Sequence, residues 1–236
     1  MIHRTYYEVR MRLQDYNKRD GKQVWLSEDE IGDFLNESET GQQWRAFMLG
    51  VRCGLRRSEI VSVRVADFLN APDGFVRVWG DYAKRDHYRE APVPDELESV
   101  VANSLRHQLD ADDPIVDVDG STVYRWVRRA AERRQAETGD QGWQFLDVHD
   151  LRRTWGGQLL WNYGLLPSSV MALGGWDDWK TFRDHYLGEM SPEAMRRERD
   201  KVDWMGSGKN ADSGSVSSVF EPQGGTGGNP VADGRF

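Results

Sequence analysis

The chain has 236 residues, of which 38% are hydrophobic and ten are Trp, and its formal net charge is −8. This length fits one sizeable domain with small appendages, and the apolar content is sufficient for a real core. The longest apolar runs are far too short to cross a bilayer, and the N-terminus has no apolar signal-peptide core. The single cysteine, Cys53, excludes an internal disulfide. We therefore expect a cytoplasmic protein that has no membrane partner.

The negative net charge argues against a nucleic-acid partner, because neutralising phosphates requires Lys and Arg. The charged residues are unevenly chosen, however, with 25 Arg against 6 Lys and 24 Asp against 15 Glu. Such a composition resembles that of proteins from salt-rich cytoplasm and predicts an origin in a halophilic archaeon or its virus. Where charge sits decides binding more than its sum does. The net charge therefore neither supports nor excludes DNA.

The N-terminal residues 1–24 are predicted to form a short helical arm, because Tyr6 to Tyr16 has the character of a polar helix. Ser27 and Glu30 then have the spacing of a capping box, in which the serine caps a helix start and the glutamate reaches back to it. A short helix to Leu35 should follow. The rest of the chain to residue 204 is predicted to form the main domain.

Apolar side chains recur at three- and four-residue steps through 41–53, which predicts an amphipathic helix that Gly54 ends. Another helix should run over 58–65. Residues 75–79 alternate as a strand does, and a second short strand ends at Val93, so the two predict a hairpin. Further helices are predicted over 95–109, 121–136, 148–163, 167–173, 177–186 and 192–202. The fold class is thus mainly α with a small antiparallel β-sheet (α+β), followed by a disordered Gly- and Ser-rich tail over 205–236.

The predicted helix over 121–136 carries five arginines against one glutamate. At helical spacing, several of these arginines share one face. The face is either a DNA-binding surface or an ordinary solvated helix surface, and the segment alone does not decide between them. The candidate DNA-binding residues are Arg125, Arg128, Arg129 and Arg133.

Three short constellations could carry chemistry. The first is Gly54-Leu55-Arg56-Arg57-Ser58-Glu59, in which an arginine follows a glycine at a helix junction. The second is His149-Asp150-Leu151-Arg152, where His and Arg share a face near a helix N-terminus that favours an anion. The third is Gly174-Gly175-Trp176 with Tyr186 ten residues later. Each alone is also compatible with an ordinary cap, a surface residue or a packed aromatic.

The order and spacing of the three constellations resemble the tyrosine recombinase (phage integrase) family over about residues 25–190. That family has a Gly-Leu-Arg-x-Ser-Glu box, a hairpin Lys, a His-x-Leu-Arg box, a Leu-Gly-His/Trp box and a nucleophilic Tyr. Here Lys84 matches the hairpin Lys best, because Arg89-Glu90-Ala91-Pro92 resembles the end of the family's hairpin. The resemblance implies a tyrosine recombinase catalytic-domain-like fold. The catalytic residues it implies are Arg56, Lys84, His149, Arg152, Trp176 and Tyr186.

The resemblance also implies a mechanism, in which Tyr186 attacks a DNA phosphodiester and forms a 3′-phosphotyrosyl link. Arg56 and Arg152 would donate paired N–H groups to the non-bridging oxygens. His149 would be the base for the phenol and Lys84 the acid for the leaving 5′ oxygen. Trp176 (the remaining site residue) would pack the arginine pair. We expect no cofactor and no metal.

As partners, the resemblance implies double-stranded DNA with specific recombination sites and a homo-tetramer assembled on it. The family usually has an N-terminal helical domain that clamps the opposite face of DNA, whereas only about 24 residues precede the matching segment here. The protein is then a minimal member, a truncated one, or one whose clamp an accessory protein supplies. Two further functions stay open: an inactive DNA-binding integrase remnant that acts as a regulator, and a type IB topoisomerase-like activity.

Overall fold

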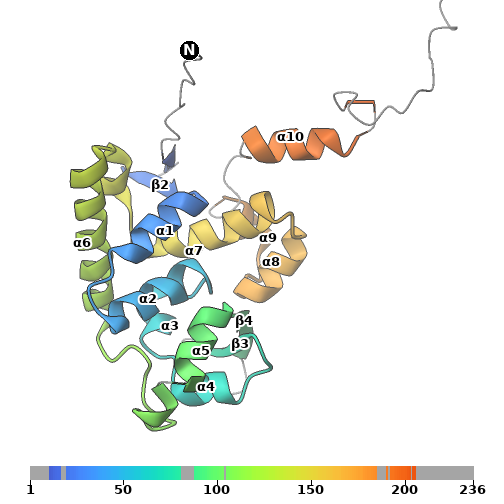
Figure 1. The fold of residues 1–236 in the computed structure, drawn as a ribbon. Helices are drawn as coiled ribbons and strands as arrows, with labels where there is room; N and C mark the ends of the chain where they lie inside the picture. Colours follow the sequence, from blue (N-terminus) through green and yellow to red (C-terminus); the bar gives the residue numbers. More distant parts are fainter. Residues whose placement is uncertain are drawn as a thin grey trace, which may run out of the picture. The chain divides into compact units, whose positions relative to one another are not determined.

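The computed structural model describes residues 11–16, 20–80, 88–103, 105–184, 190, 192–202 and 204–205. Over these residues the chain is mostly helical and has two small two-stranded antiparallel sheets (Figure 1). The predicted fold class is thereby confirmed. Compactness divides the chain into Met1–Ala194 and Met195–Phe236. Lys84, Tyr186 and the predicted tail beyond residue 205 lie outside the described residues.

The N-terminal segment is a strand pair where the sequence predicted a helix. β1 (Arg12–Asp15) pairs antiparallel with β2 (Lys22–Trp25), and Arg12 stands opposite Trp25. The prediction of a helical arm is therefore wrong for these strands. The reason is a tertiary contact, because β2 packs on α7 (Val148–Gly157). There the N–H of Val24 donates to Asp150 Oδ1 at 3.2 Å. Extended backbone exposes such N–H groups, whereas a helix would use them internally.

The next elements follow the predicted pattern closely. α1 (Glu28–Asn36) begins with the predicted capping box, in which Ser27 Oγ accepts from the Glu30 N–H and the carboxylate accepts from the Ser27 N–H. α2 (Gly41–Val51) buries most of its second half and packs against α7. Its apolar periodicity therefore did indicate a core helix.

The predicted helix over 58–65 is two short helices, α3 (Arg57–Ile60) and α4 (Val65–Leu69). Between them the chain turns at Val61 and Ser62 and then pairs with the segment near Ile115, whose N–H donates to the Val63 carbonyl at 3.0 Å. β3 (Phe75–Trp79) and β4 (Tyr88–Pro92) then form the predicted hairpin strands.

The remaining helices match the predictions in place but differ in detail. The helix predicted over 148–163 is α-helical only in its first part and continues as a π-helix, η3. The elements in chain order are α5 (Asp95–Asn103), η1 (Leu105–His107), α6 (Gly120–Thr138), η2 (Gln141–Phe145), α7 (Val148–Gly157), η3 (Gln158–Asn162), α8 (Pro167–Gly174), α9 (Trp179–Phe182) and α10 (Pro192–Asp200).

Two apolar clusters make up the core of the described residues. The larger contains β2, α1, α2 and the buried faces of α5, α6 and the start of α7. The smaller joins the end of α7 to η3, α8 and α9, and its buried members are Trp155, Leu160, Val170, Trp176 and Phe182. Because α7 contributes to both clusters, its position is fixed from two directions, and it carries His149 and Arg152.

Candidate active site

The turn after α2 presents Arg56 at the start of α3. Gly54 adopts φ +68°, and a Cβ placed on it would lie 2.5 Å from Cδ2 of Trp155 on α7. Only glycine accepts both the left-handed backbone and this close approach. Arg56 is the N-cap residue of α3 and has extended backbone. The sequence box beginning at Gly54 therefore packs its glycine against α7 and starts α3 two residues later at Arg56.

Arg152 points from α7 into the interior and is fully buried. Its Nη1 donates to the carbonyl of Gly54, and its Nη2 donates to the carbonyl of Gly174 at 2.5 Å. The guanidinium carbon lies 4.1 Å from the centre of the Trp176 ring, which is a cation–π contact. The sequence analysis predicted that Trp176 packs the arginine pair, and the structure has this ring contact for Arg152.

Arg56, at the start of α3, contacts the same turn at Gly174 and Gly175. Its Nη2 donates to the carbonyl of Gly175 at 3.3 Å, next to the carbonyl that Arg152 uses. Two guanidiniums that are distant in sequence therefore meet at the turn that follows α8. Arg152 is inaccessible, whereas the Arg56 side chain is 40% exposed. A ligand from solvent would accordingly meet Arg56 first.

Both glycines of this turn are needed for close packing. A Cβ on Gly174 would lie 2.7 Å from Cη2 of Trp176. Gly175 has φ +65°, and a Cβ there would lie 2.7 Å from Cδ of Arg89. Trp176 in turn packs on Trp155 and Phe182, with ring centres 5.9 and 4.9 Å away. The second glycine leaves room for Arg89.

Glu59 links Arg56 to a third arginine that the sequence reasoning missed. Its carboxylate is buried and accepts from the N–H and Nη1 of Arg56, each at 2.7 Å. It also accepts from Nη1 and Nη2 of Arg89, at 2.8 and 2.9 Å. Burial raises the pKa of Glu59, but the hydrogen bonds and charges of Arg89 and Arg56 outweigh it and lower that pKa to about 2. Glu59 is thus an anion between two cations.

Arg89 is a correction to the sequence analysis, in which it marked the end of the hairpin and was expected to contact the DNA backbone or to be a solvated charge. Its side chain is 13% exposed and its guanidinium forms a bidentate ion pair with Glu59. The signal that could have found it is weak, since it consists of one arginine four residues before the end of a short strand segment. Its partner lies on another element, which spacing does not reveal.

His149 is exposed near the start of α7, at the end of the helix where N–H groups favour an anion. It lies on the helix that also carries Arg152. Lys84 and Tyr186 fall outside the described residues, so their predicted roles stay predictions. The neighbouring Arg153 is buried and forms an ion pair with Asp150.

The four predicted DNA-binding arginines of α6 have different surroundings. Arg125 is exposed and, among the described residues, donates to hydroxyls of the first helical turn, Ser121 and Thr122. Arg129 is exposed as well, and the described residues offer it no carboxylate.

The other two of these arginines are engaged with the rest of the domain. Arg128 donates to the carbonyls of Gln144 and Leu146 at 2.7 and 2.9 Å. Arg133 pairs with Glu37 and Glu39 at 2.7 and 3.0 Å. Available positive charge is therefore concentrated in the N-terminal half of α6.

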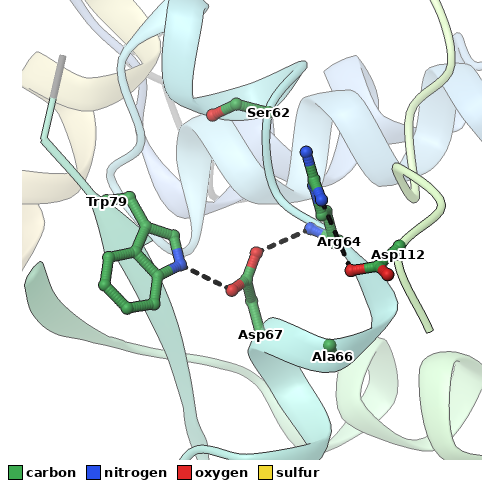
Figure 2. A pocket seen from close by; sticks show the side chains of 6 residues that line it. All are labelled: Ser62, Arg64, Ala66, Asp67, Trp79 and Asp112. Atoms are coloured by element: carbon green, nitrogen blue, oxygen red, sulfur yellow. Dashed lines mark hydrogen bonds and ion pairs between the residues drawn. The ribbon is translucent and has the colours of Figure 1, made fainter. Parts of the chain in front are cut away.

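A separate pocket contains none of the predicted site residues (Figure 2). In it the Trp79 Nε1 donates to Asp67 Oδ1 at 2.7 Å, and Asp67 Oδ2 accepts from the Arg64 N–H at 2.9 Å. Arg64 also reaches Asp112 at 3.4 Å. These bonds fix Trp79 at the end of β3, opposite Tyr88. The pocket wall therefore supports the end of the β3–β4 strand pair at which Trp79 and Tyr88 face each other.

Two possible features do not occur among the described residues. They contain no group of three or more His, Cys, Asp or Glu side chains that could hold a metal ion. Their helices are also all too short or too polar to cross a membrane.

Comparison with known families decides the relationship of this chain. The model of the phage integrase family matches residues 24–190, which is more than half of the sequence. The chain belongs to the phage integrase family. The predicted resemblance over residues 25–190 is therefore confirmed. Within the family match lie Arg56, His149, Arg152 and Trp176, whose arrangement is described above.

Solved structures show the same fold at low sequence identity. XerA recombinase is 19% identical with a TM-score of 0.58, and the alignment covers 75% of this chain and 62% of XerA. The Tn1549 transposon integrase, in complex with transposon right end DNA, is 14% identical with a TM-score of 0.57, over 76% and 66% of the two chains. XerH site-specific recombinase bound to difH substrate is 16% identical with a TM-score of 0.53, over 76% and 54%.

This family member thus spans under two thirds of the length of XerA and of XerH. No protein with a curated description matches the chain significantly. The comparisons give no support to the predicted origin in a halophilic archaeon or its virus, which rests on composition alone.

Proposed function

We propose that this chain is a site-specific DNA recombinase that cuts and rejoins strands through a 3′-phosphotyrosyl intermediate on Tyr186. The observation that carries the proposal is the convergence of Arg56 and Arg152 on the adjacent carbonyls of Gly175 and Gly174. Positive charge held at one turn, with Arg56 accessible and Arg152 buried behind it, suits a phosphate whose charge increases in the transition state. Membership of the phage integrase family supports the same reaction.

In the proposed reaction the Tyr186 oxygen attacks phosphorus while the bond to the 5′ oxygen breaks. The phenol proton goes to His149, and Lys84 gives a proton to the leaving 5′ oxygen. Arg56 and Arg152 stabilise the charge on the non-bridging oxygens. The reverse attack by a 5′ hydroxyl reseals the strand, so no cofactor is required.

The proposed partner is double-stranded DNA, held in part by α6. Arg125 and Arg129 have no carboxylate partner among the described residues and would neutralise backbone phosphates. The XerH and Tn1549 neighbours were solved with DNA. We further propose assembly as a homo-tetramer on two sites, with an accessory protein supplying a clamp if no other part of the protein does so.

The test is covalent capture on nicked duplexes that cover the DNA flanking the gene. Protein and DNA are mixed in low and in molar KCl, SDS is added, and adducts are separated on a gel. The wild type and the Tyr163→Phe control should form an adduct, and Tyr186→Phe should form none. Tyr163 is a matched control because it is a tyrosine of the same chain and is 61% exposed.

Other outcomes would contradict parts of the proposal. An adduct that persists in Tyr186→Phe would mean that another tyrosine is the nucleophile. Salt-dependent binding without an adduct would favour a DNA-binding regulator. Adduct formation with relaxation of supercoils but no strand exchange would favour a topoisomerase. The absence of both an adduct and DNA binding would contradict the recombinase function.

A further inference from the structure

Three charged groups form a cluster in which the carboxylate of Glu59 is saturated by donors. Oε1 accepts from Nη1 of both arginines, and Oε2 accepts from the Arg56 N–H and the Arg89 Nη2. Arg89 gives both terminal nitrogens to Glu59, whereas Arg56 gives one and directs the other at Gly175. The two arginines therefore divide the carboxylate unequally.

The charges of the cluster explain why this division matters. One carboxylate between two guanidiniums leaves one net positive charge. If Glu59 had Arg56 as its only cation, the pair would be neutral, and a buried carboxylate would bind its single partner as fully as possible. Arg56 would then offer a phosphate less charge and fewer free N–H groups.

We propose that Arg89 is a positioning residue, which neutralises Glu59 so that Glu59 can orient Arg56 without cancelling its charge. This inference rests on the proposed function of Arg56 in holding the scissile phosphate. Glu59 without Arg89 would hold Arg56 but also neutralise its charge. The Glu59–Arg89 pair is neutral and holds Arg56 in place. The exposures agree with these roles, because Arg89 is 13% exposed and Arg56 is 40% exposed.

The neighbours of Arg89 hold it in this place. It follows Tyr88, which pairs across the sheet with Trp79, and Trp79 is fixed by Asp67. On its other side, the missing Cβ of Gly175 leaves space for the Arg89 stem. Arg89 thus connects β4, α3 and the turn after α8. The Trp79–Tyr88 end of the strand pair and the arginine pocket are thereby held in one arrangement.

The test is a double-mutant cycle with Arg89→Met, which keeps an unbranched apolar stem, and Glu59→Gln, which removes the charge to be offset. Single-turnover adduct formation is measured at saturating DNA, alongside DNA affinity. Arg89→Met should slow adduct formation about tenfold or more in the wild-type background, with affinity changed less than about threefold. In the Glu59→Gln background, Arg89→Met should slow adduct formation less than about threefold. Arg89→Lys should recover part of the rate, because it retains the charge.

Equal losses in both backgrounds would overturn the proposal, because a purely structural role of Arg89 does not depend on the charge of residue 59. If Arg89→Met alone does not fold, the double variant is compared with Glu59→Gln. A rate of adduct formation reduced less than about threefold supports the proposal, and a rate reduced about tenfold overturns it. The guanidinium ¹⁵N signals of Arg56 are recorded without DNA as a second readout. They should shift with Arg89→Met only when Glu59 is present. If the wild type forms no adduct, the proposed function fails, and the NMR result still decides the arrangement of the three residues.

Discussion

Replacing Gly54 with alanine should destabilise the domain and disturb the arginine pocket together. The residue has φ +68°, and an added Cβ would lie 2.5 Å from Cδ2 of Trp155, whose side chain is buried in the core. Its carbonyl also accepts from Arg152. A shift of this turn away from Trp155 would therefore move an acceptor of Arg152 and the segment leading to Arg56.

The size of the effect follows from two separate costs. A non-glycine residue in the left-handed region costs roughly 1–2 kcal/mol. Overpacking against a ring in a filled core adds about 1–3 kcal/mol. Gly54→Ala should thus lower the free energy of unfolding by about 2–5 kcal/mol. Gly164 carries the first cost alone, because it has φ +69° and a Cβ there would meet nothing within 4 Å, so the difference between the two variants measures the second cost.

The assay is equilibrium unfolding in urea, with both the midpoint and the slope recorded for wild type, Gly54→Ala and Gly164→Ala. Gly164→Ala should lose only the backbone cost, about 1–2 kcal/mol. The reasoning would be refuted if Gly54→Ala were no less stable than Gly164→Ala. Equal losses would mean that the close approach of Gly54 to Trp155 has no energetic consequence.

Three further predictions concern charge. The pKa of Glu59 is about 2 in the folded protein, against an ordinary value of 4.5. The ionised group therefore stabilises the fold above pH 4.5, and this contribution of about 3 kcal/mol is lost as pH falls toward 2. Glu59→Gln should flatten the acid-unfolding curve between pH 4.5 and 2, and an unchanged curve would contradict this prediction. Arg129→Gln should reduce the slope of log affinity for DNA against log salt by about one, whereas Arg133→Gln, which removes an arginine already paired with Glu37 and Glu39, should leave the slope unchanged. The unfolding midpoint should rise from low to molar KCl if the acidic composition is a salt adaptation, and a midpoint independent of KCl would remove that hypothesis.

Local sequence patterns predicted the elements whose ends are locally determined. Ser27 and Glu30 form their capping box between neighbours in the chain, and the alternation of residues 75–79 matches β3 at both ends. The N-terminal strand pair was missed because its backbone bonds to Asp150, far along the chain. Within the segment predicted as a polar helix, Arg12–Asp15 pairs as a strand with β2, which that bond ties to α7.

The pocket was predictable only as a set of residues, not as a geometry. The family resemblance named Arg56, Arg152 and Trp176, and the structure brings them to one turn. Nothing in the spacing showed that Arg89 would bind Glu59, since a bidentate pair depends on where a strand and a helix meet. Sequence logic recognised the residues that the family shares and missed the one that supports them.

The most direct measurement is to map the covalent adduct. The protein–DNA adduct is digested with protease and nuclease, and the modified peptide is sequenced by mass spectrometry. The account predicts one nucleotide-linked tyrosine, Tyr186, in a wild type that forms the adduct and in Tyr163→Phe. A nucleotide on any other tyrosine, or an adduct that forms equally well in Arg152→Lys, would contradict the proposal that the arginine pocket presents a phosphate to Tyr186.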